Sequence, residues 1–146
     1  MKNDKTDNHE QLFWEEIDRL FPDMIKAIAS LSKKSYLSIT NLRTGITWWS
    51  ERAMDYFGMK ENYTIRGMQK ANRKIHPDDV ATFKRGFKER VDGKNLDTAW
   101  EYRIQDGDSY NRFNAMARVL YDEQKQPFII IIRYDNYGIS DEVDSV

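Results

Sequence analysis

The segment "PFIIIIRY" near the end of the chain constrains the fold more than any other stretch. Successive side chains of a β-strand point to opposite faces of its sheet, so a strand with one wet face alternates apolar and polar residues. Residues 128–132 do not alternate, because four successive isoleucines leave no polar face. We therefore predict a strand that is covered on both sides and lies in the centre of its sheet.

Four further strands are predicted from runs rich in β-branched and aromatic residues. Gly45 supplies a turn between the first two runs because it adopts a positive φ without strain, and "DGDS" supplies a turn between the last two. The last two runs alternate, with Trp100, Tyr102 and Ile104 on one face of the first of them. The four predicted strands are residues 36–41, 46–50, 98–105 and 110–121.

The apolar residues between positions 11 and 31 follow helical spacing, with successive intervals of three or four. Pro22 lies inside this segment and must kink the helix or divide it. The seam admits two interpretations, a helix packed on its own domain or a helix that joins two copies of the chain. We predict that it covers the sheet face opposite the core, in its own chain or in a partner. The seam consists of Phe13, Ile17, Leu20, Met24, Ile28 and Leu31.

His76 is the first residue of the sequence "HPDD", which has three possible interpretations: a metal site, an acid–base site or a helix start. A metal site would combine His76 with Asp78 and Asp79, but a mononuclear site needs about three well-placed ligands, and His9 lies in the polar amino-terminal stretch. General acid–base catalysis would need an orienting partner and a nucleophile or a bound water. The sequence contains no nucleophile elbow, phosphate loop or metalloprotease motif. We therefore expect neither a metal ion nor catalytic residues.

A helix start explains more of this stretch. Proline is favoured at the first helical position, and aspartates in the first turn interact well with the helix dipole. The apolar residues that follow are spaced by three and four and form one stripe, and a glycine stands where the helix should stop. The stripe consists of Val80, Phe83, Phe87 and Val91. A shorter helix is predicted between Ser50, as its N-cap, and Gly58, as its stop.

The composition restricts partners and cofactors. The 146 residues suit one domain, and 23 Lys and Arg against 24 Asp and Glu leave no electrostatic basis for binding nucleic acid or an anionic membrane. The absence of cysteine excludes disulfides, thiolate metal sites and cysteinyl–flavin chemistry. The longest apolar run is far shorter than the roughly 20 residues of a membrane span. The polar start lacks the apolar run of a signal peptide, so a cytoplasmic protein is expected.

The order of these elements resembles a PAS domain. The similarity is closest to the branch with an "HPDD" helix start and a following "EYRI…DG" hairpin, which correspond here to "IHPDDVATFKRGF" and "WEYRIQDGDSYNRF". The segments "ITWWSERAMDYFGM" and "FIIIIRYDNYG" look like the family's second strand with its first helix, and its last strand. Ser50 stands where an asparagine is common, and Asn136 and Tyr137 depart from the usual exit sequence after Asp135.

The resemblance implies an α+β fold. It consists of a PAS-like five-stranded antiparallel sheet with short helices on one face, and we expect the amino-terminal amphipathic helix to cover the other. The expected organisation is a disordered tail at residues 1–9, the helical segment 10–34, the PAS domain 35–138 and an acidic tail at 139–146.

The family implies a non-catalytic module for sensing and dimerisation in signal transduction. It would bind a small molecule and act on an effector in a longer or a separate protein, such as a histidine kinase, a diguanylate cyclase or a transcription factor. A homodimer through the amino-terminal helix is expected, with no nucleic acid or membrane as partner. The alternatives are a small α+β enzyme or carrier with a cone-shaped pocket, and a haem- or flavin-binding sensor.

Seven residues are candidates to line a cavity on the core side of the sheet, although ordinary core packing explains the same positions and is favoured. No cofactor is expected, and the small ligand is unidentified. Haem is disfavoured because its candidate ligand, His76, would cap a helix, and non-covalent flavin has no positive support. The seven residues are Met54, Phe57, Ile75, Phe83, Phe87, Tyr102 and Phe113.

Overall fold

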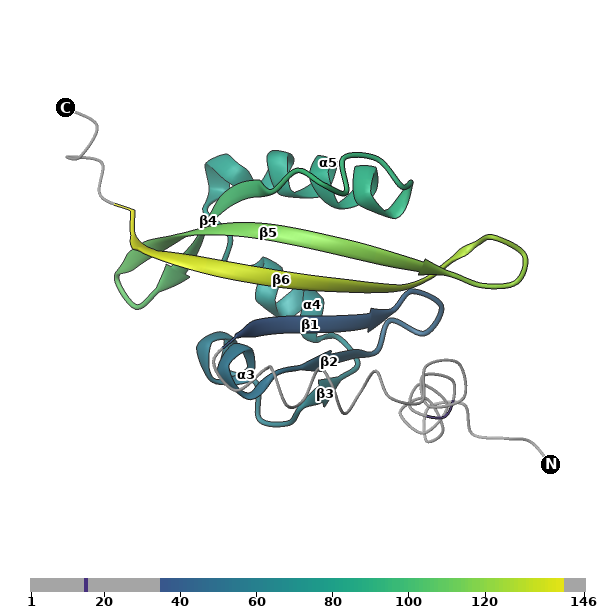
Figure 1. Ribbon diagram of the computed structural model, residues 1–146. Helices are drawn as coiled ribbons and strands as arrows, with labels where there is room; N and C mark the ends of the chain where they lie inside the picture. Colours follow the sequence, from purple (N-terminus) through teal and green to yellow (C-terminus); the bar gives the residue numbers. More distant parts are fainter. Residues whose placement is uncertain (1–14, 16–34, 141–146) are drawn as a thin grey trace.

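The structure, a computed structural model, describes Glu15 and residues 35–140. Apart from Glu15, the predicted amphipathic segment 10–34 lies outside the described residues, as do the predicted tail 1–9 and residues 141–146. Residues 35–140 form one antiparallel sheet and several short helices (Figure 1). In chain order the elements are β1 (Tyr36–Asn41), β2 (Thr47–Trp49), α3 (Glu51–Phe57), β3 (Tyr63–Thr64), α4 (Gly67–Asn72), η2 (Pro77–Asp79), α5 (Val80–Val91), β4 (Trp100–Asp106), β5 (Ser109–Tyr121) and β6 (Pro127–Ile139).

Strand β6 lies in the middle of the sheet, as its sequence predicts. The strand order is β3-β2-β1-β6-β5-β4, and all neighbouring strands are antiparallel. Ile131 stands opposite Ile39 of β1 on one side and opposite Arg118 of β5 on the other. Both edges of the isoleucine run are therefore paired within the sheet, which removes it as a site of edge-to-edge aggregation.

The sheet of the described residues has six strands, whereas the resemblance implied five. The additional strand is β3, in which Tyr63 and Thr64 pair with Trp48 and Thr47 of β2. The sequence around β3 predicts a loop with helical turns, and the short helix α4 does follow it. Two residues are too few to show an alternating pattern, so β3 becomes a strand only through its pairing with β2.

One face of the sheet carries the main hydrophobic core. The buried face of β4 consists of Trp100, Tyr102 and Ile104, which confirms the predicted alternation. Helices α3 and α5 contribute Phe57 and Phe83 to the same cluster, and Figure 1 shows α4 behind β1 and β6. The helices thus cover the side of the sheet on which the alternating strands place their large apolar residues.

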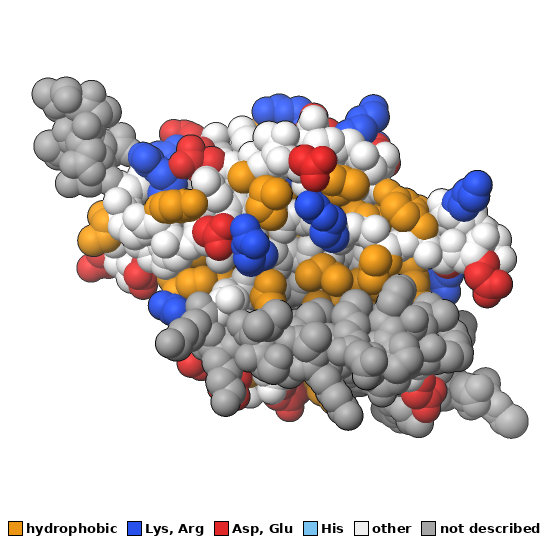
Figure 2. Space-filling model, in the orientation of Figure 1, with side chains coloured by type: hydrophobic (Ala, Val, Ile, Leu, Met, Phe, Trp, Pro, Cys, Tyr) orange, Lys and Arg blue, Asp and Glu red, His pale blue; other side chains and the backbone are white. Residues whose placement is uncertain are grey.

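The opposite face carries a second apolar cluster, which we call the outer cluster. The isoleucines of β6 divide between the two faces, because Ile130 and Ile132 belong to the main core while Ile129 and Ile131 belong to the outer cluster. Figure 2 shows apolar side chains in a band across this face, beside charged side chains. The outer cluster has the buried members Ile39, Ile46, Phe128 and Ile129 and the half-buried members Trp48, Tyr63, Leu120 and Ile131.

Ser50 fixes the start of α3 to the first strand. Its hydroxyl accepts hydrogen bonds from the backbone N–H of Ala53 at 3.3 Å and of Leu37 at 3.0 Å, and it donates to the carbonyl of Ser35 at 2.7 Å. The helix ends at Gly58, whose φ of 72° lies in the left-handed region. Serine therefore fulfils the predicted capping role at this position, and it also ties α3 to the entry of β1.

Helix α5 approaches β4 at a glycine. A Cβ atom on Gly86 would lie 2.9 Å from Cδ1 of the buried Trp100 indole, which is closer than real Cβ contacts. On the same indole lies the guanidinium of Arg90, 4.1 Å from the ring centroid, and Arg90 also donates to the carbonyl of Gly86 at 3.2 Å. The absence of a side chain at position 86 thus sets the distance between helix and sheet.

We predict that Gly86→Ala lowers the free energy of unfolding by about 1–2 kcal/mol, measured by urea denaturation. The overpacking penalty of about 1–3 kcal/mol exceeds the gain of about 1 kcal/mol in helix propensity. In a Trp100→Phe background the indole is gone, so the same substitution should become neutral or stabilising. An equal loss in both backgrounds would contradict this packing account.

Candidate functional site

The seven predicted cavity residues all join the main core cluster. Five of them are buried, and Met54 and Phe87 are half-buried against the cluster. The rings of Phe83 and Tyr102 are in contact, with centroids 5.0 Å apart. The sequence pattern thus brings together residues from α3, the segment before η2, α5, β4 and β5. Their arrangement is that of a packed core, and the hollows described below are lined by other residues.

Tyr102 places a hydroxyl in the middle of this core. Its side chain is 2% exposed, and within residues 35–140 no protein group hydrogen-bonds to its hydroxyl or to the neighbouring Trp100 Nε1. The Tyr134 hydroxyl, by contrast, lies 3.2 Å from Ser38 Oγ. Burial raises the pKa of Tyr134 to about 12 and raises the pKa of Tyr102 well above 10. Both phenols are therefore neutral at physiological pH and available as hydrogen-bond donors.

A third tyrosine joins the helices to the sheet. The Tyr56 hydroxyl donates to the carbonyl of Ile104 at 3.3 Å and accepts from Asn111 Nδ2 at 3.0 Å. Burial raises the pKa of Tyr56 to about 12, and its ring packs edge-on against Tyr36 and Phe113. Sequence reasoning did not select Tyr56, Tyr134 or Asn111, because nothing in the spacing of single tyrosines and asparagines distinguishes a buried hydroxyl from an exposed one.

His76 acts as a helix cap. Its Nδ1 accepts a hydrogen bond from the backbone N–H of Asp78 at 3.1 Å, and Pro77 occupies the first position of η2, as predicted. The His76 ring lies against Tyr110, with centroids 4.6 Å apart. Within the part of the chain that the structure describes, no three His, Asp or Glu side chains are grouped closely enough to hold a metal ion. The geometry at His76 is therefore that of a cap.

Asp79 joins the start of α5 to β4 through hydrogen bonds with Arg103. One carboxylate oxygen accepts from the backbone N–H and from Nε of Arg103, both at 2.8 Å, and the other accepts from Nη2 at 2.9 Å. These hydrogen bonds from Arg103 hold the pKa of Asp79 below its ordinary value of 3.8 and outweigh the opposing effect of burial. The sequence predicted a carboxylate at a helix start, but it gave no sign of the partner on β4.

Two open hollows border these features. One of about 430 Å³ lies beside the cap and is lined by His76, Asp78, Arg103, Ser109, Tyr110 and Ser140. The other, of about 400 Å³, lies where the described chain enters β1 and leaves β6, and includes Arg52, whose guanidinium stacks 4.9 Å from the Tyr36 ring centroid. The first hollow contains His76, Asp78 and Ser109, but His76 Nδ1 accepts from the backbone N–H of Asp78, and Ser109 Oγ donates to the carbonyl of Asp106 at 3.2 Å. These hydrogen bonds do not join the three side chains into a nucleophile, a base and an orienting group.

This arrangement defines a class of proteins: small α+β domains in which an antiparallel sheet holds short helices around an apolar core. The model of one sequence family, described as the PAS fold, matches residues 46–132, which is more than half of the chain. The chain belongs to the PAS fold family. No curated protein sequence matches it at a significant level.

Several solved structures have a similar fold. A PAS domain from Colwellia psychrerythraea matches with a TM-score of 0.60 at 15% identity, covering 82% of this chain and 98% of that one. A sensory box histidine kinase/response regulator from Burkholderia thailandensis matches with a TM-score of 0.59 at 16% identity, covering 80% and 85%. The N-terminal domain of a diguanylate cyclase with PAS/PAC sensor from Marinobacter aquaeolei matches with 0.59 at 15%, covering 72% and 96%. These identities support the fold alone.

None of the helices in the described part of the chain has the length and apolar composition that a membrane span requires.

We predict that Asp79→Asn lowers the free energy of unfolding by about 1–3 kcal/mol at neutral pH, because charge-assisted hydrogen bonds to Arg103 are lost. Since the folded pKa is depressed, this stabilisation is complete above the ordinary value of 3.8 and disappears as the pH falls through the folded value. The difference between variant and wild type should therefore narrow below pH 3.8, as measured by urea denaturation across acidic pH. Asp78→Asn, one residue away and exposed, is the control; an equal loss there would contradict the prediction.

We predict that Tyr102→Phe leaves the free energy of unfolding unchanged or raises it by up to about 1 kcal/mol, because it removes a buried hydroxyl that has no protein partner within residues 35–140. Tyr134→Phe is the matched control, since it loses the contact with Ser38 and should lower stability by about 1 kcal/mol. A greater loss for Tyr102→Phe than for Tyr134→Phe would show that the Tyr102 hydroxyl has a partner in solution. Differential scanning calorimetry of the two variants decides this.

Proposed function

We propose that this chain is a non-catalytic PAS module that senses a signal, dimerises and relays the change to an effector. The observation that carries the proposal is the outer cluster, because the sheet has a second apolar face in addition to the one that the described helices cover. A face of this kind is typical of a docking surface rather than of a wall that faces water.

The occupant we propose for the outer cluster is the amphipathic segment 10–34. Its seam from Phe13 to Leu31 would extend at most about 27 Å as a helix, less with a kink at Pro22, which is still enough to cross several strands spaced about 4.8 Å apart. The segment leads directly into β1, and Ile39 of β1 is a buried member of the outer cluster. Over β4 and β5 the same face bears ion-paired charges, such as Arg112 with Glu101, which would direct an apolar seam toward β1, β2 and β6.

The composition of the core favours a sensory module over an enzyme or carrier. A catalytic cavity in the core of the domain would need converging ionisable groups, such as a buried aspartate beside a histidine or tyrosine. Among residues 35–140, the buried polar and charged side chains include no aspartate, glutamate or histidine. They are Ser38, Thr40, Asn41, Thr47, Ser50, Arg90 and Asn111.

The pairing of the first and last strands supports the proposed relay. Tyr36, at the start of β1, pairs with Tyr134 of β6, and the hollow around them also contains Ser35 and Gly138. A shift between β1 and β6 would therefore move the incoming and outgoing chain together. Effectors of the kinds named for the structural neighbours, a histidine kinase or a diguanylate cyclase, are the recipients we propose.

A small ligand in the main core is the second candidate, and it is favoured by the Tyr102 hydroxyl, which has no protein partner among the described residues. Together with Trp100 Nε1 it would supply two donors on an otherwise apolar wall, which is the usual composition of a ligand site. Such a ligand would shift the module between two states only by its difference in affinity for them. Native mass spectrometry of protein purified from its source would detect a retained molecule.

We predict that the full chain is a dimer by size-exclusion chromatography with light scattering, and that deletion of residues 1–33 yields a monomer, because the docking segment is removed. Ile131→Lys places a charge in the outer cluster and should weaken the dimer in the same way. Asn114→Lys is the control, since it lies on the same sheet face opposite Asp135, outside the cluster. A monomer for both the full and the shortened chain would remove dimerisation from the proposal.

A further inference from the structure

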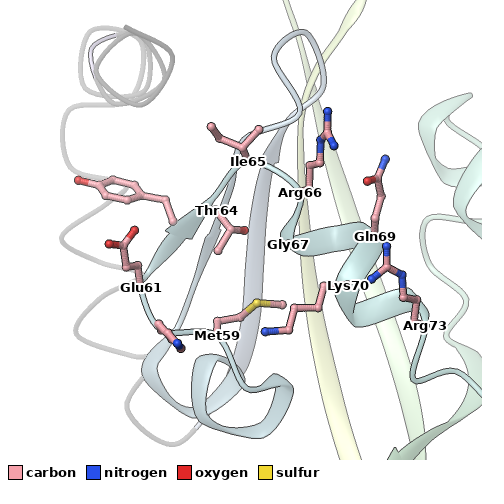
Figure 3. Close-up of a pocket in the computed structure, with 11 residues that line it drawn as sticks. Met59, Glu61, Thr64, Ile65, Arg66, Gly67, Gln69, Lys70 and Arg73 are labelled. Carbon is pink, nitrogen blue, oxygen red and sulfur yellow. The ribbon is translucent and has the colours of Figure 1, made fainter. Parts of the chain in front are cut away.

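A hollow of about 620 Å³ lies between β3 and α4, at the edge of the sheet away from β4 (Figure 3). It shares Met59 with the main core cluster and Tyr63 with the outer cluster, and its other lining residues belong to neither. Its volume falls within the range of about 300–1,000 Å³ that is typical of small-molecule sites. It is lined by Met59, Lys60, Glu61, Tyr63, Thr64, Ile65, Arg66, Gly67, Gln69, Lys70 and Arg73.

The walls of this hollow are held by buried contacts. Trp49 Nε1 donates to Thr64 Oγ1 at 3.0 Å, which fixes β3 to the buried Trp49. A Cβ on Gly67 would lie 1.8 Å from the same Thr64 oxygen, so only glycine allows α4 to begin this close to β3. On the other side, Lys70 Nζ donates to the carbonyl of Gly58 at 2.9 Å. The hollow is thus part of the folded domain.

The lining is strongly cationic. It contains four basic residues, Lys60, Arg66, Lys70 and Arg73, against the single acid Glu61, on a chain whose net charge is −1. All five side chains are exposed, and within residues 35–140 no ion pair neutralises Lys60, Arg66 or Arg73. Because these positive charges are clustered and have no acidic partners among those residues, the electrostatic potential in the hollow is positive. Such a potential favours the binding of a multiply charged anion.

The hollow also has an apolar side. Met59 is buried at its base, and Ile65 is 45% exposed on the β3 side, which makes it one of the exposed large apolar residues of the described chain. Figure 3 shows Arg66, Gln69, Lys70 and Arg73 on the side of α4, with Glu61, Thr64 and Ile65 on the side of β3. A ligand lying here would meet cations and the Gln69 amide on one wall, and Ile65 beside Glu61 and Thr64 on the other.

We propose that this hollow binds a small phosphate ester, with the phosphate held by Arg66, Lys70 and Arg73 and the organic part against Met59 and Ile65. A phosphate dianion matches the excess of positive charge better than a single carboxylate, and arginine guanidinium groups bind phosphate oxygens in a bidentate manner. The proposal goes beyond the sensory role proposed above, since it concerns a different part of the domain. Trp49 would couple the site to the core, because its ring also contacts Phe57, with centroids 5.3 Å apart.

The test is isothermal titration calorimetry of the full chain with inorganic pyrophosphate, adenosine 5′-monophosphate and adenosine. We expect the two phosphates to bind with micromolar to millimolar affinity that falls with added salt, and adenosine to be at least about tenfold weaker. Tighter binding of the nucleotide than of pyrophosphate would identify an ester as the ligand, whereas the reverse order would identify a free inorganic anion and overturn the apolar part of the site.

Arg73→Gln and Arg66→Gln should each weaken phosphate binding at least about tenfold, because each removes a charge-assisted contact. Arg85→Gln on α5 is the matched control, since it removes the same charge from an exposed arginine that is not in the hollow, and it should leave affinity within about twofold. Thermal melts verify that all three variants fold. Equal effects of Arg73→Gln and Arg85→Gln, or no binding of either phosphate below about 10 mM, would overturn the proposal.

Discussion

Strand β6 is stable only if both of its faces are buried against apolar groups and both of its edges are paired with other strands. The positions of the other strands and helices follow from this requirement. Burial of an isoleucine side chain is worth roughly 1.5–3 kcal/mol, so exposing the two isoleucines on either face to water would lose about twice that amount. The helices satisfy the need on one face, where Ile130 and Ile132 lie in the main core. On the other face, Ile129 and Ile131 belong to the outer cluster, which is the surface on which we propose that segment 10–34 docks.

The two edges of the sheet differ in what covers them. At β4 the edge is occupied by the chain just before η2, because Ile75 bridges to Ile104, His76 N donates to the Arg103 carbonyl and Asp79 binds Arg103. The "HPDD" stretch is therefore both a helix start and an edge cover. At the opposite edge β3 is only two residues long, and beside it lies the cationic hollow. The cationic hollow of about 620 Å³ thus lies at the edge that the helix start does not cover, whereas a hollow of about 430 Å³ lies beside the His76 cap.

Much of the fold followed from periodicity and from turn and cap residues. The alternation in β4 and β5, the Ser50 cap, the glycine stops and the isoleucine run each reflect local chemistry that one strand or helix carries in its own residues. The predicted core residues also meet, because an apolar stripe on a helix and an apolar face on a strand must be buried together. The misses were β3, which is too short for a period, and the partners of Tyr56, Tyr134 and Asp79, which are distant in sequence.

What the sequence determined by itself was the set of elements, the central place of the isoleucine run and the family resemblance, because burial preference and backbone propensity act within a few residues. Tertiary structure decided which side chains face one another. It left the Tyr102 hydroxyl without a protein partner in residues 35–140, placed Arg103 on Asp79, and gathered basic residues around the hollow at β3 and α4. Such pairings depend on strand register and on close approaches at glycines such as Gly67, and those are set only when the whole sheet and its helices pack.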